Sequence, residues 1–273
     1  MDFLLEMIQS SARRAEQARA ERPLLPPDDP LPARRFRDAL AGPGEAARAS
    51  LQPEPLAVIA EVKRRSPSKG DIAPHLDAVA QARAYEAAGA DAVSVLTEPF
   101  RFGGSMDDLR AVAAAVGIPV LRKDFIVDPY QVWEAADAGA AAVLLIAAAL
   151  PSRSLQALLH ECHDCGLDAL VEVHDEDDLE RAYAVGASII GVNNRDLRSL
   201  EVDLAVSERL GALMGRCVIF VSESGIHSPG EAKRVRTAGA QAVLVGEALV
   251  NTPRERLPGA VAALRSVQPD APA

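Results

Sequence analysis

Charged side chains stand where an apolar strand of this chain should end. The stretch IAEVKRRSPSKG, residues 59–70, begins as a buried strand and then places Glu61 and Lys63 two residues apart. Residues two apart in a strand share a face, so a carboxylate and an ammonium group would point the same way. A buried strand accepts such charges only when they are paired or used. The pattern is typical of acid–base chemistry as well as of a structural ion pair.

The same feature recurs at four later apolar runs. They end in Lys123, in Glu172, in Asn193 with Arg195, and in Ser224. A single Lys–Glu pair could simply close a layer of a core. Polar residues at so many strand ends favour a catalytic site, because the carboxyl ends of parallel strands converge on one mouth.

A repeat indicates which elements position these residues. Residues 87–96, 137–146, 184–193 and 237–246 each read as a helix end, Gly-Ala and a short apolar run. The glycine is typical of a helix C-cap and the apolar run of a buried strand. Further strand-like runs begin near residues 56, 119, 168 and 217, with helical segments between them. Eight β-α units without a GxGxxG fingerprint predict an α/β protein with a (β/α)8 TIM barrel.

Three segments are predicted along the chain. Residues 1–50 do not follow the repeat and predict an N-terminal helical extension, with a proline-rich stretch between two helices. Residues 51–267 are expected to form the catalytic barrel, and residues 268–273 a frayed C-terminal tail. The extension is expected to cap the barrel or to contribute to its mouth.

Glycines follow the last two predicted strands. The segments SESGIHSPGEA and VGEALV place Gly225 and Gly246 where backbone N–H groups can approach an oxyanion, with a helix start beyond each. The loops after strands seven and eight are the usual phosphate site of such barrels. A phosphorylated small-molecule substrate is therefore predicted.

Composition argues against several classes of partner. The net charge of −10 does not suit nucleic acid or an anionic membrane surface. Asp2 and Glu6 interrupt the apolar N-terminus, unlike a secretory signal, and the longest uncharged apolar run, 138–150, is too short to cross a bilayer. These features predict a cytoplasmic protein. A monomer or weak homo-oligomer is expected, although none of these features bears on the oligomeric state.

Two further motifs resemble metal sites. The CHDC segment, residues 162–165, lacks the second ligand pair that zinc would need, and is expected to be part of an ordinary helix. Acidic residues after His174 are expected in the first turn of a helix, where its dipole favours them. We therefore expect neither a metal nor an organic cofactor.

The chain resembles the indole-3-glycerol phosphate synthase family. The family's E-x-K-x-x-S-P-S signature is present in IAEVKRRSPSKG, and later blocks such as PVLRKDFIVDPYQV, LVEVHDEDDLERA, IIGVNNRDL, VSESGI and VLVGEALV follow in order. The resemblance implies a lyase of tryptophan biosynthesis. Its substrate, 1-(2-carboxyphenylamino)-1-deoxyribulose 5-phosphate, closes a ring and loses carbon dioxide and water.

The resemblance also implies catalytic roles. Lys123 would protonate the ketone oxygen during ring closure, and Glu172 would act as the acid/base for proton removal and loss of the hydroxyl. Lys63 would bind the substrate's carboxylate, Glu61 would orient the lysines, and Asn193 would hydrogen-bond the substrate. Which lysine acts in which step stays open at this point.

Other matching positions would bind the substrate. The expected substrate-binding residues are Ser66, Pro67, Phe102, Phe125 and Arg195, and the expected phosphate-binding residues are Ser224, Gly225, Gly246 and Glu247. Glu247 departs from the serine often found there. A carboxylate repels phosphate, so we expect its backbone N–H to serve while its side chain turns away.

Two alternatives stay open on the residues alone. Another phosphosugar isomerase, or a Schiff-base aldolase, would use Lys63 or Lys123 as a nucleophile. A noncatalytic barrel would instead be expected to have lost charges at its strand ends, and those charges are present.

Overall fold

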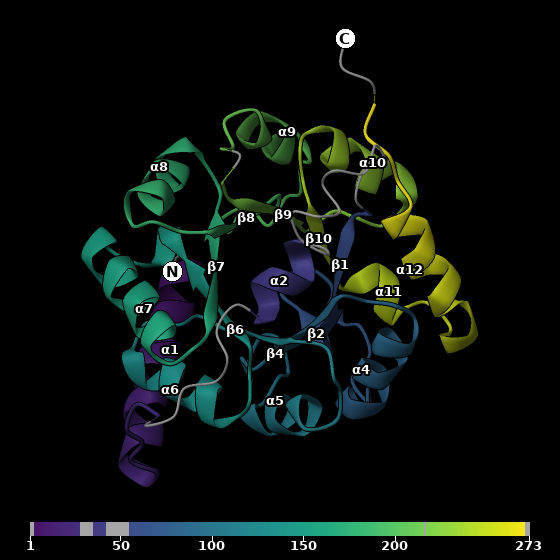
Figure 1. Ribbon diagram of the computed structural model, residues 1–273. Coiled ribbons are helices and arrows are strands. Elements are labelled where there is room, and N and C mark those ends of the chain that lie inside the picture. The colour runs from purple at the N-terminus through teal and green to yellow at the C-terminus, as the bar shows by residue number, and fades with distance from the viewer. Residues whose placement is uncertain (1–2, 28–34, 42–54, 216, 271–273) are drawn as a thin grey trace.

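The computed structural model describes residues 3–27, 35–41, 55–215 and 217–270. Within these residues eight parallel strands close into one barrel, in the order β1, β10, β9, β8, β7, β6, β5, β4 (Figure 1). The strands are β1 (Ala57–Val62), β4 (Ala92–Leu96), β5 (Val120–Lys123), β6 (Ala142–Ile146), β7 (Asp168–Val173), β8 (Ile189–Asn193), β9 (Ile219–Glu223) and β10 (Ala242–Val245). The predicted TIM barrel is confirmed.

Helices cover the outside of the barrel and alternate with its strands. They are α4 (Ala78–Ala87), α5 (Met106–Ala113), α6 (Pro129–Asp137), α7 (Ser152–Asp164), α8 (Glu176–Ala184), α9 (Ala205–Gly211), α10 (Pro229–Thr237), α11 (Glu247–Val250) and α12 (Leu257–Arg265). Two 3-10 turns, η1 (Ala147–Ala149) and η2 (Arg254–Arg256), and a hairpin of β2 (Arg65–Ser66) with β3 (Gly70–Asp71) complete this part of the chain.

Local sequence explains where the helices begin and end. Asp or Ser side chains accept hydrogen bonds from the first turns of α4, α5, α6, α8 and α10. Each glycine of the repeat has a positive φ, from +80° to +102°, just beyond a helix end. The repeat therefore encodes the turn from each helix into the next strand.

The apolar residues form two layers because strand residues alternate in direction. Ile59, Leu121 and Leu170 belong to the cluster that fills the barrel, whereas Val58 and Val171 pack between the strands and the helices. Charges that continue the inward series of a strand must therefore emerge at an end of the barrel interior.

The short helix α2 (Arg35–Ala41) closes the amino end of the barrel and lies across its centre in Figure 1. Phe36 and Leu40 are buried within the interior cluster. The backbone N–H groups of Phe36 and Arg37 both donate to the carboxylate of Asp168, at the start of β7. This helix blocks the amino end, so substrate must enter from the carboxyl end.

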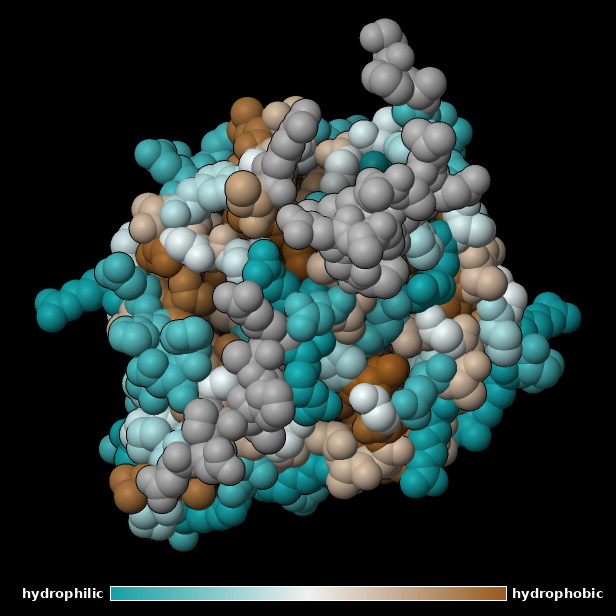
Figure 2. All heavy atoms as spheres, viewed as in Figure 1, coloured by the Kyte–Doolittle hydropathy of each residue, from teal (hydrophilic) through white to brown (hydrophobic). Residues whose placement is uncertain are grey.

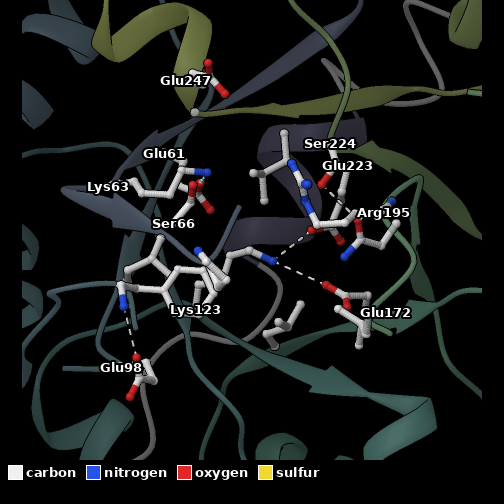
Figure 3. A pocket seen from close by; sticks show the side chains of 18 of the residues that line it. Glu61, Lys63, Ser66, Glu98, Lys123, Glu172, Arg195, Glu223, Ser224 and Glu247 are labelled. Carbon is white, nitrogen blue, oxygen red and sulfur yellow. Dashed lines mark hydrogen bonds and ion pairs between the residues drawn. The ribbon is translucent and has the colours of Figure 1, made fainter. Parts of the chain in front are cut away.

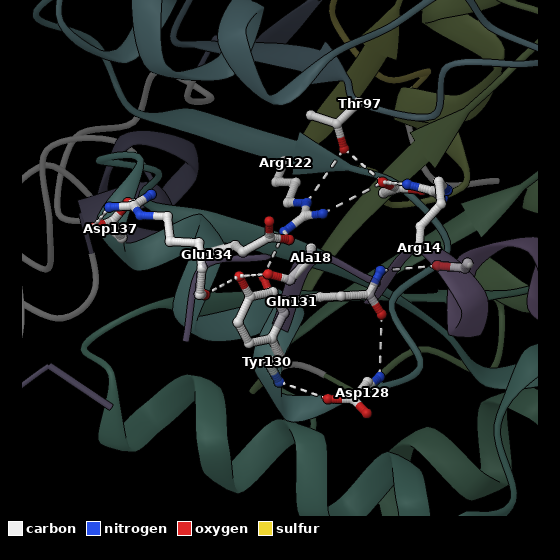
Figure 4. A network of polar contacts seen from close by, with 12 residues as sticks. Arg14, Ala18, Thr97, Arg122, Asp128, Tyr130, Gln131, Glu134 and Asp137 are labelled. Carbon is white, nitrogen blue, oxygen red and sulfur yellow. Dashed lines mark hydrogen bonds and ion pairs between the residues drawn. The ribbon is translucent and has the colours of Figure 1, made fainter. Parts of the chain in front are cut away.

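The helix α1 (Phe3–Glu21) lies against the carboxyl end of β5 (Figure 4). Arg14 donates to both oxygens of the buried Asp124 carboxylate, at 2.8 and 3.0 Å. Ser11 donates to the backbone oxygen of Phe125, and Tyr130 on α6 donates to two backbone oxygens of the α1 segment. The helix thus contributes to the mouth, one of the two roles expected of it.

The outer face viewed in Figure 2 is mixed in character, with brown hydrophobic patches interrupted by teal polar side chains. None of the helices in the described ranges is long and apolar enough to cross a membrane.

The predicted boundary near residue 50 lies outside the described residues. In the predicted tail, Asp270 forms an ion pair with Lys233 and its N–H donates to Thr237, so the tail contacts α10 up to this residue.

Candidate active site

A cavity that is partly open to solvent lies at the carboxyl ends of the strands. Its walls include every residue expected to act in catalysis or binding, together with the turns that follow β8, β9 and β10. The inward-facing charges come together here because parallel strands end at the same rim. All the site residues predicted from the sequence therefore lie around one cavity.

Lys123 lies on the floor of the cavity between two carboxylates (Figure 3). Its Nζ is 3.0 Å from Glu223 Oε2 and 3.3 Å from Glu172 Oε2. Both carboxylates are almost fully buried, whereas the Lys123 side chain is 16% exposed to the cavity. The arrangement gives one cation access to substrate while two anions hold it in place.

The electrostatics of these three groups differ. Burial would lower the pKa of Lys123, but the surrounding carboxylates outweigh burial and raise it, so this side chain is an ammonium ion. Burial also raises the pKa of Glu223, to about 7, and the nearby Glu172 adds to the rise. The pKa of Glu172 is lowered despite burial, because Lys123 and His174 stabilise its charge.

Glu61 and Lys63 form a second charged pair at the end of β1, with 2.5 Å between Oε1 and Nζ. Gly246 makes room for this pair. A Cβ at that position would lie 2.6 Å from Glu61 Oε1 and 3.0 Å from Lys63 Nζ. The glycine after β10 therefore lets the charged pair approach the backbone closely.

The turns after β9 and β10 form the expected phosphate end of the cavity. Ser224 and Gly225 both have positive φ, +66° and +79°. The hydroxyl of Ser224 donates to Asn193 Oδ1 at 2.9 Å, which links the ends of β9 and β8. Gly246 directly precedes the first turn of α11. Residues of both turns line the cavity, and backbone N–H groups of such turns can bind an oxyanion.

Glu247 has a partner that the sequence did not reveal. Lys69, on the turn between β2 and β3, places its Nζ 2.8 Å from Glu247 Oε1. In Figure 3 the Glu247 side chain lies apart from the group around Lys123. Its hydrogen bond to Lys69 lowers the pKa of Glu247. The Glu247 carboxylate is thus paired with Lys69, and this contact links the loop after β1 to the turn after β10.

Aromatic rings line the opposite end. Phe102 and Phe125 have ring centroids 6.4 Å apart, and Phe3 of α1 meets Phe125 at 6.2 Å. Glu98 is buried and accepts the N–H groups of residues 100, 101 and 102, which fixes the loop that carries Phe102. This end offers an apolar wall for a flat ring.

Comparison with known proteins identifies the family. The family model for indole-3-glycerol phosphate synthase matches residues 6–258. An indole-3-glycerol phosphate synthase of Nocardioides sp. is 53% identical over 225 residues, 82% of this chain and 80% of its own length. One from Mycolicibacterium vanbaalenii is 53% identical over 204 residues, 75% of each chain. The chain belongs to this family.

Structural neighbours support the fold alone. A solved structure described as native KDPGal has a TM-score of 0.57 at 17% identity, over 79% of this chain and 95% of its own. Membership of the indole-3-glycerol phosphate synthase family makes the chain a carboxy-lyase of tryptophan biosynthesis.

Sequence reasoning missed Glu223. It treated Ser224 as the polar end of its strand, but β9 ends at Glu223, and Ser224 begins the turn. The period-two rule could have found Glu223, since it continues the inward series of Ile219 and Val221. The register also pairs Glu223 with Asn193 on β8.

Other neighbours of the cavity gave no comparable signal. Phe3 and Glu98 reach it through long-range packing.

The acidic residues after His174 do begin α8, with Asp175 as its N-cap, as predicted. Cys162 and Cys165 are both free and buried at the end of α7, and burial raises the pKa of each thiol. Across the described ranges, no cluster of three or more His, Cys, Asp and Glu is arranged to hold a metal ion.

Proposed function

We propose that the residues of this mouth carry out the family reaction, the conversion of 1-(2-carboxyphenylamino)-1-deoxyribulose 5-phosphate to indole-3-glycerol phosphate. The observation that carries the proposal is the position of Lys123, an ammonium ion between Glu172 and Glu223 on the cavity floor. It lies between the turns after β9 and β10, which we expect to bind the phosphate, and the aromatic rings of Phe102 and Phe125. The three steps are ring closure, decarboxylation and dehydration.

Ring closure places negative charge on the ketone oxygen as an aromatic carbon attacks it. Lys123 is the group that can donate a proton to this oxygen, because it is charged and partly exposed to the cavity. Lys63 has 19% of its side chain exposed and pairs with Glu61 behind it, which suits a cation that holds the substrate's carboxylate until carbon dioxide leaves.

Dehydration needs a base for the ring proton and an acid for the departing hydroxyl. Glu172, whose pKa is lowered, is the base, and Glu223, whose pKa is raised to about 7, is the acid. After water leaves, Glu172 has gained a proton, whereas Lys123 and Glu223 have each given one up. Lys123 contacts Glu172 and can regain its proton from that carboxyl group. Solvent then supplies the proton that returns Glu223 to its acid form, which is the one proton that loss of carbon dioxide from a carboxylate consumes.

Binding is divided between the two ends. Backbone N–H groups near Ser224, Gly225 and Gly246 would hold the phosphate, assisted by Arg195, and Phe102 with Phe125 would hold the anthranilate ring. Ser66 and Pro67 shape the loop after β1, where the Ser66 hydroxyl accepts the N–H of Lys69. These steps are proton transfers and a decarboxylation, so they require no cofactor.

An assay of fluorescent indole product from the synthetic carboxyphenylamino substrate tests the proposal. Wild type should form product, and Lys123→Ala should reduce turnover by at least about 100-fold. Borohydride added with substrate should trap no adduct, since an ammonium ion held by two carboxylates is a poor nucleophile. A trapped lysine without indole product would support the aldolase alternative instead.

Two further expectations belong to the proposal. We expect the protein to act in the cytoplasm, as a pathway enzyme whose partner is a small phosphorylated molecule. A monomer or weak homo-oligomer is expected, because the described residues on one chain already surround the whole cavity. Sedimentation at several concentrations, together with activity, would test this expectation.

A further inference from the structure

His174 contacts the candidate base from behind. It follows β7 directly, two residues after Glu172, so the two side chains emerge on the same side. His174 Nε2 lies 3.3 Å from Glu172 Oε1, and Nδ1 lies 3.5 Å from Asp178 Oδ2 in the first turn of α8. The imidazole is 15% exposed and does not line the cavity. It therefore acts on substrate only through Glu172.

The two carboxylates determine the charge of the imidazole. A neutral imidazole donates from one nitrogen only, whereas both nitrogens of His174 face a carboxylate oxygen. Burial would lower the pKa of His174, but Asp178 and Glu172 raise it to about 10. The side chain is an imidazolium ion across the neutral range.

The imidazolium distinguishes two otherwise similar glutamates. Glu172 and Glu223 are both buried and both contact Lys123 through Oε2. Glu172 Oε1 also lies 3.3 Å from His174 Nε2, whereas among the described residues Glu223 forms an ion pair with Lys123 alone. One glutamate thus has two cationic partners, and the other has one.

We propose that His174, anchored by Asp178, is the positioning residue that keeps Glu172 ionised as the base. Glu223 is then the one of the two glutamates that carries a proton. The proposal rests on the proposed function, because it assumes that Glu172 is the base.

Charged and polar groups from α8, β5 and β8 surround this pair. Asp178 faces His174 from α8, and Arg181 donates to Asp178 on the same helix. Lys123 from β5 faces the far oxygen of Glu172, and Asn193 from β8 adds a hydrogen bond that lowers its pKa. Removal of His174 would leave Glu172 with one cation instead of two.

The test is the pH dependence of kcat for His174→Gln, which removes the charge but keeps a similar size and a hydrogen-bond donor. The acid limb of the profile should move upward by about one pH unit, so kcat on that limb should fall about tenfold, with little change in KM. His174→Lys restores a cation and should return the limb toward the wild-type position. A merely structural role would lower Tm without moving the limb.

His160→Gln is a matched control. His160 and Asp164 have the same i,i+4 spacing and the same 3.5 Å separation as His174 and Asp178, but they lie on the exposed side of α7. This variant should keep the wild-type profile. An unmoved acid limb in His174→Gln would overturn the proposal, provided that Glu172→Gln is inactive. An active Glu172→Gln would instead overturn the assignment of the base, and with it this inference.

A measurement on the unmodified protein does not depend on how the variants fold. In ¹⁵N-labelled protein, both ring nitrogens of His174 should stay protonated at pH 8. A neutral His174 at pH 8 would contradict the proposal.

Discussion

Gly191 on β8 makes room for the Glu223 carboxylate, and this feature gives a sharp prediction. The register places Gly191 opposite Glu172 on β7 and Val221 on β9. A Cβ at Gly191 would lie 2.2 Å from Glu223 Oε1 and 3.2 Å from Leu170 Cδ1. Any larger residue must therefore displace the Glu223 carboxylate, which Lys123 holds at 3.0 Å.

The size of the effect of Gly191→Ala follows from these distances. An ordinary contact between carbon and oxygen needs about 3.4 Å, so the carboxylate must move by roughly 1.2 Å from its present 2.2 Å. A misplacement of about 1 Å at a reacting group can reduce turnover about 100-fold. Stability should change less, by about 1–2 kcal/mol, because the displaced atom is the end of a flexible side chain.

The assay compares kcat with the midpoint of urea unfolding in the same preparations. Gly259→Ala is the control, since a Cβ at this position on α12 meets no atom within 4 Å. The control should keep its turnover and gain about 0.5 kcal/mol from the loss of chain entropy in the unfolded state.

A double-mutant cycle tests whether the effect passes through Glu223. Glu223→Gln alone should reduce turnover strongly, and Gly191→Ala should add little to it, because the group that the methyl displaces no longer acts as an acid. Gly191→Ala with turnover within twofold of wild type would refute the reasoning. Full additivity of the two losses would mean that the methyl acts through another group, such as Leu170.

Three further predictions follow from the charges. Arg14→Ala should cost about 2 kcal/mol at pH 7 by exposing the buried Asp124 to one fewer cation. Burial would raise the pKa of Asp124, but Arg14 and Arg122 lower it, so this stabilisation is present above the unfolded pKa and is lost as pH falls through the folded value. Denaturation should therefore show a larger penalty at pH 7 than near pH 3. Lys69→Ala should raise KM about two- to fivefold with kcat unchanged, because an exposed ion pair contributes little; the double variant Lys69→Glu with Glu247→Lys should restore KM, and failure to do so would exclude a latch between the loops. The kcat of wild type should decrease as pH rises through about 7, where Glu223 loses its proton, and a rate that is flat to pH 9 would contradict its role as the acid.

The fold could be predicted because its determinants are local. The Gly-Ala repeat, the Asp and Ser caps and the β-branched runs each act within one β-α unit, and their number required a closed barrel. The position of α1 against the barrel was harder to predict. It depends on contacts between residues more than 100 positions apart, such as Arg14 with Asp124 and Ser11 with Phe125. No periodicity in the sequence records such a contact.

The site divides in the same way. Glu61 and Lys63 could be placed because the inward face of β1 follows from period two, and Glu223 was accessible to the same rule. The alternation of strand side chains alone could also predict that His174 lies beside Glu172. The charge of the imidazole could not be predicted in this way, because it depends on a second carboxylate, Asp178, on the next helix. The Lys69 contact required knowledge of how the loop after β1 crosses to α11.

The charges of the mouth explain how a protein of net charge −10 can hold a substrate with a phosphate and a carboxylate. Lys63, Lys69 and Lys123 are each paired with a glutamate, so they give no large positive field.

Within the described part of the chain Arg195 forms no ion pair within 4.0 Å. It donates to the backbone oxygen of Leu200 instead. Its half-burial lowers its pKa, yet the carboxylates of Glu247 and Glu61 oppose the shift, so the guanidinium stays charged. A desolvated cation without a carboxylate partner attracts a phosphate more strongly than a neutralised lysine does. Arg195→Ala should therefore weaken binding of inorganic phosphate more than Lys69→Ala does, and equal losses would contradict this account.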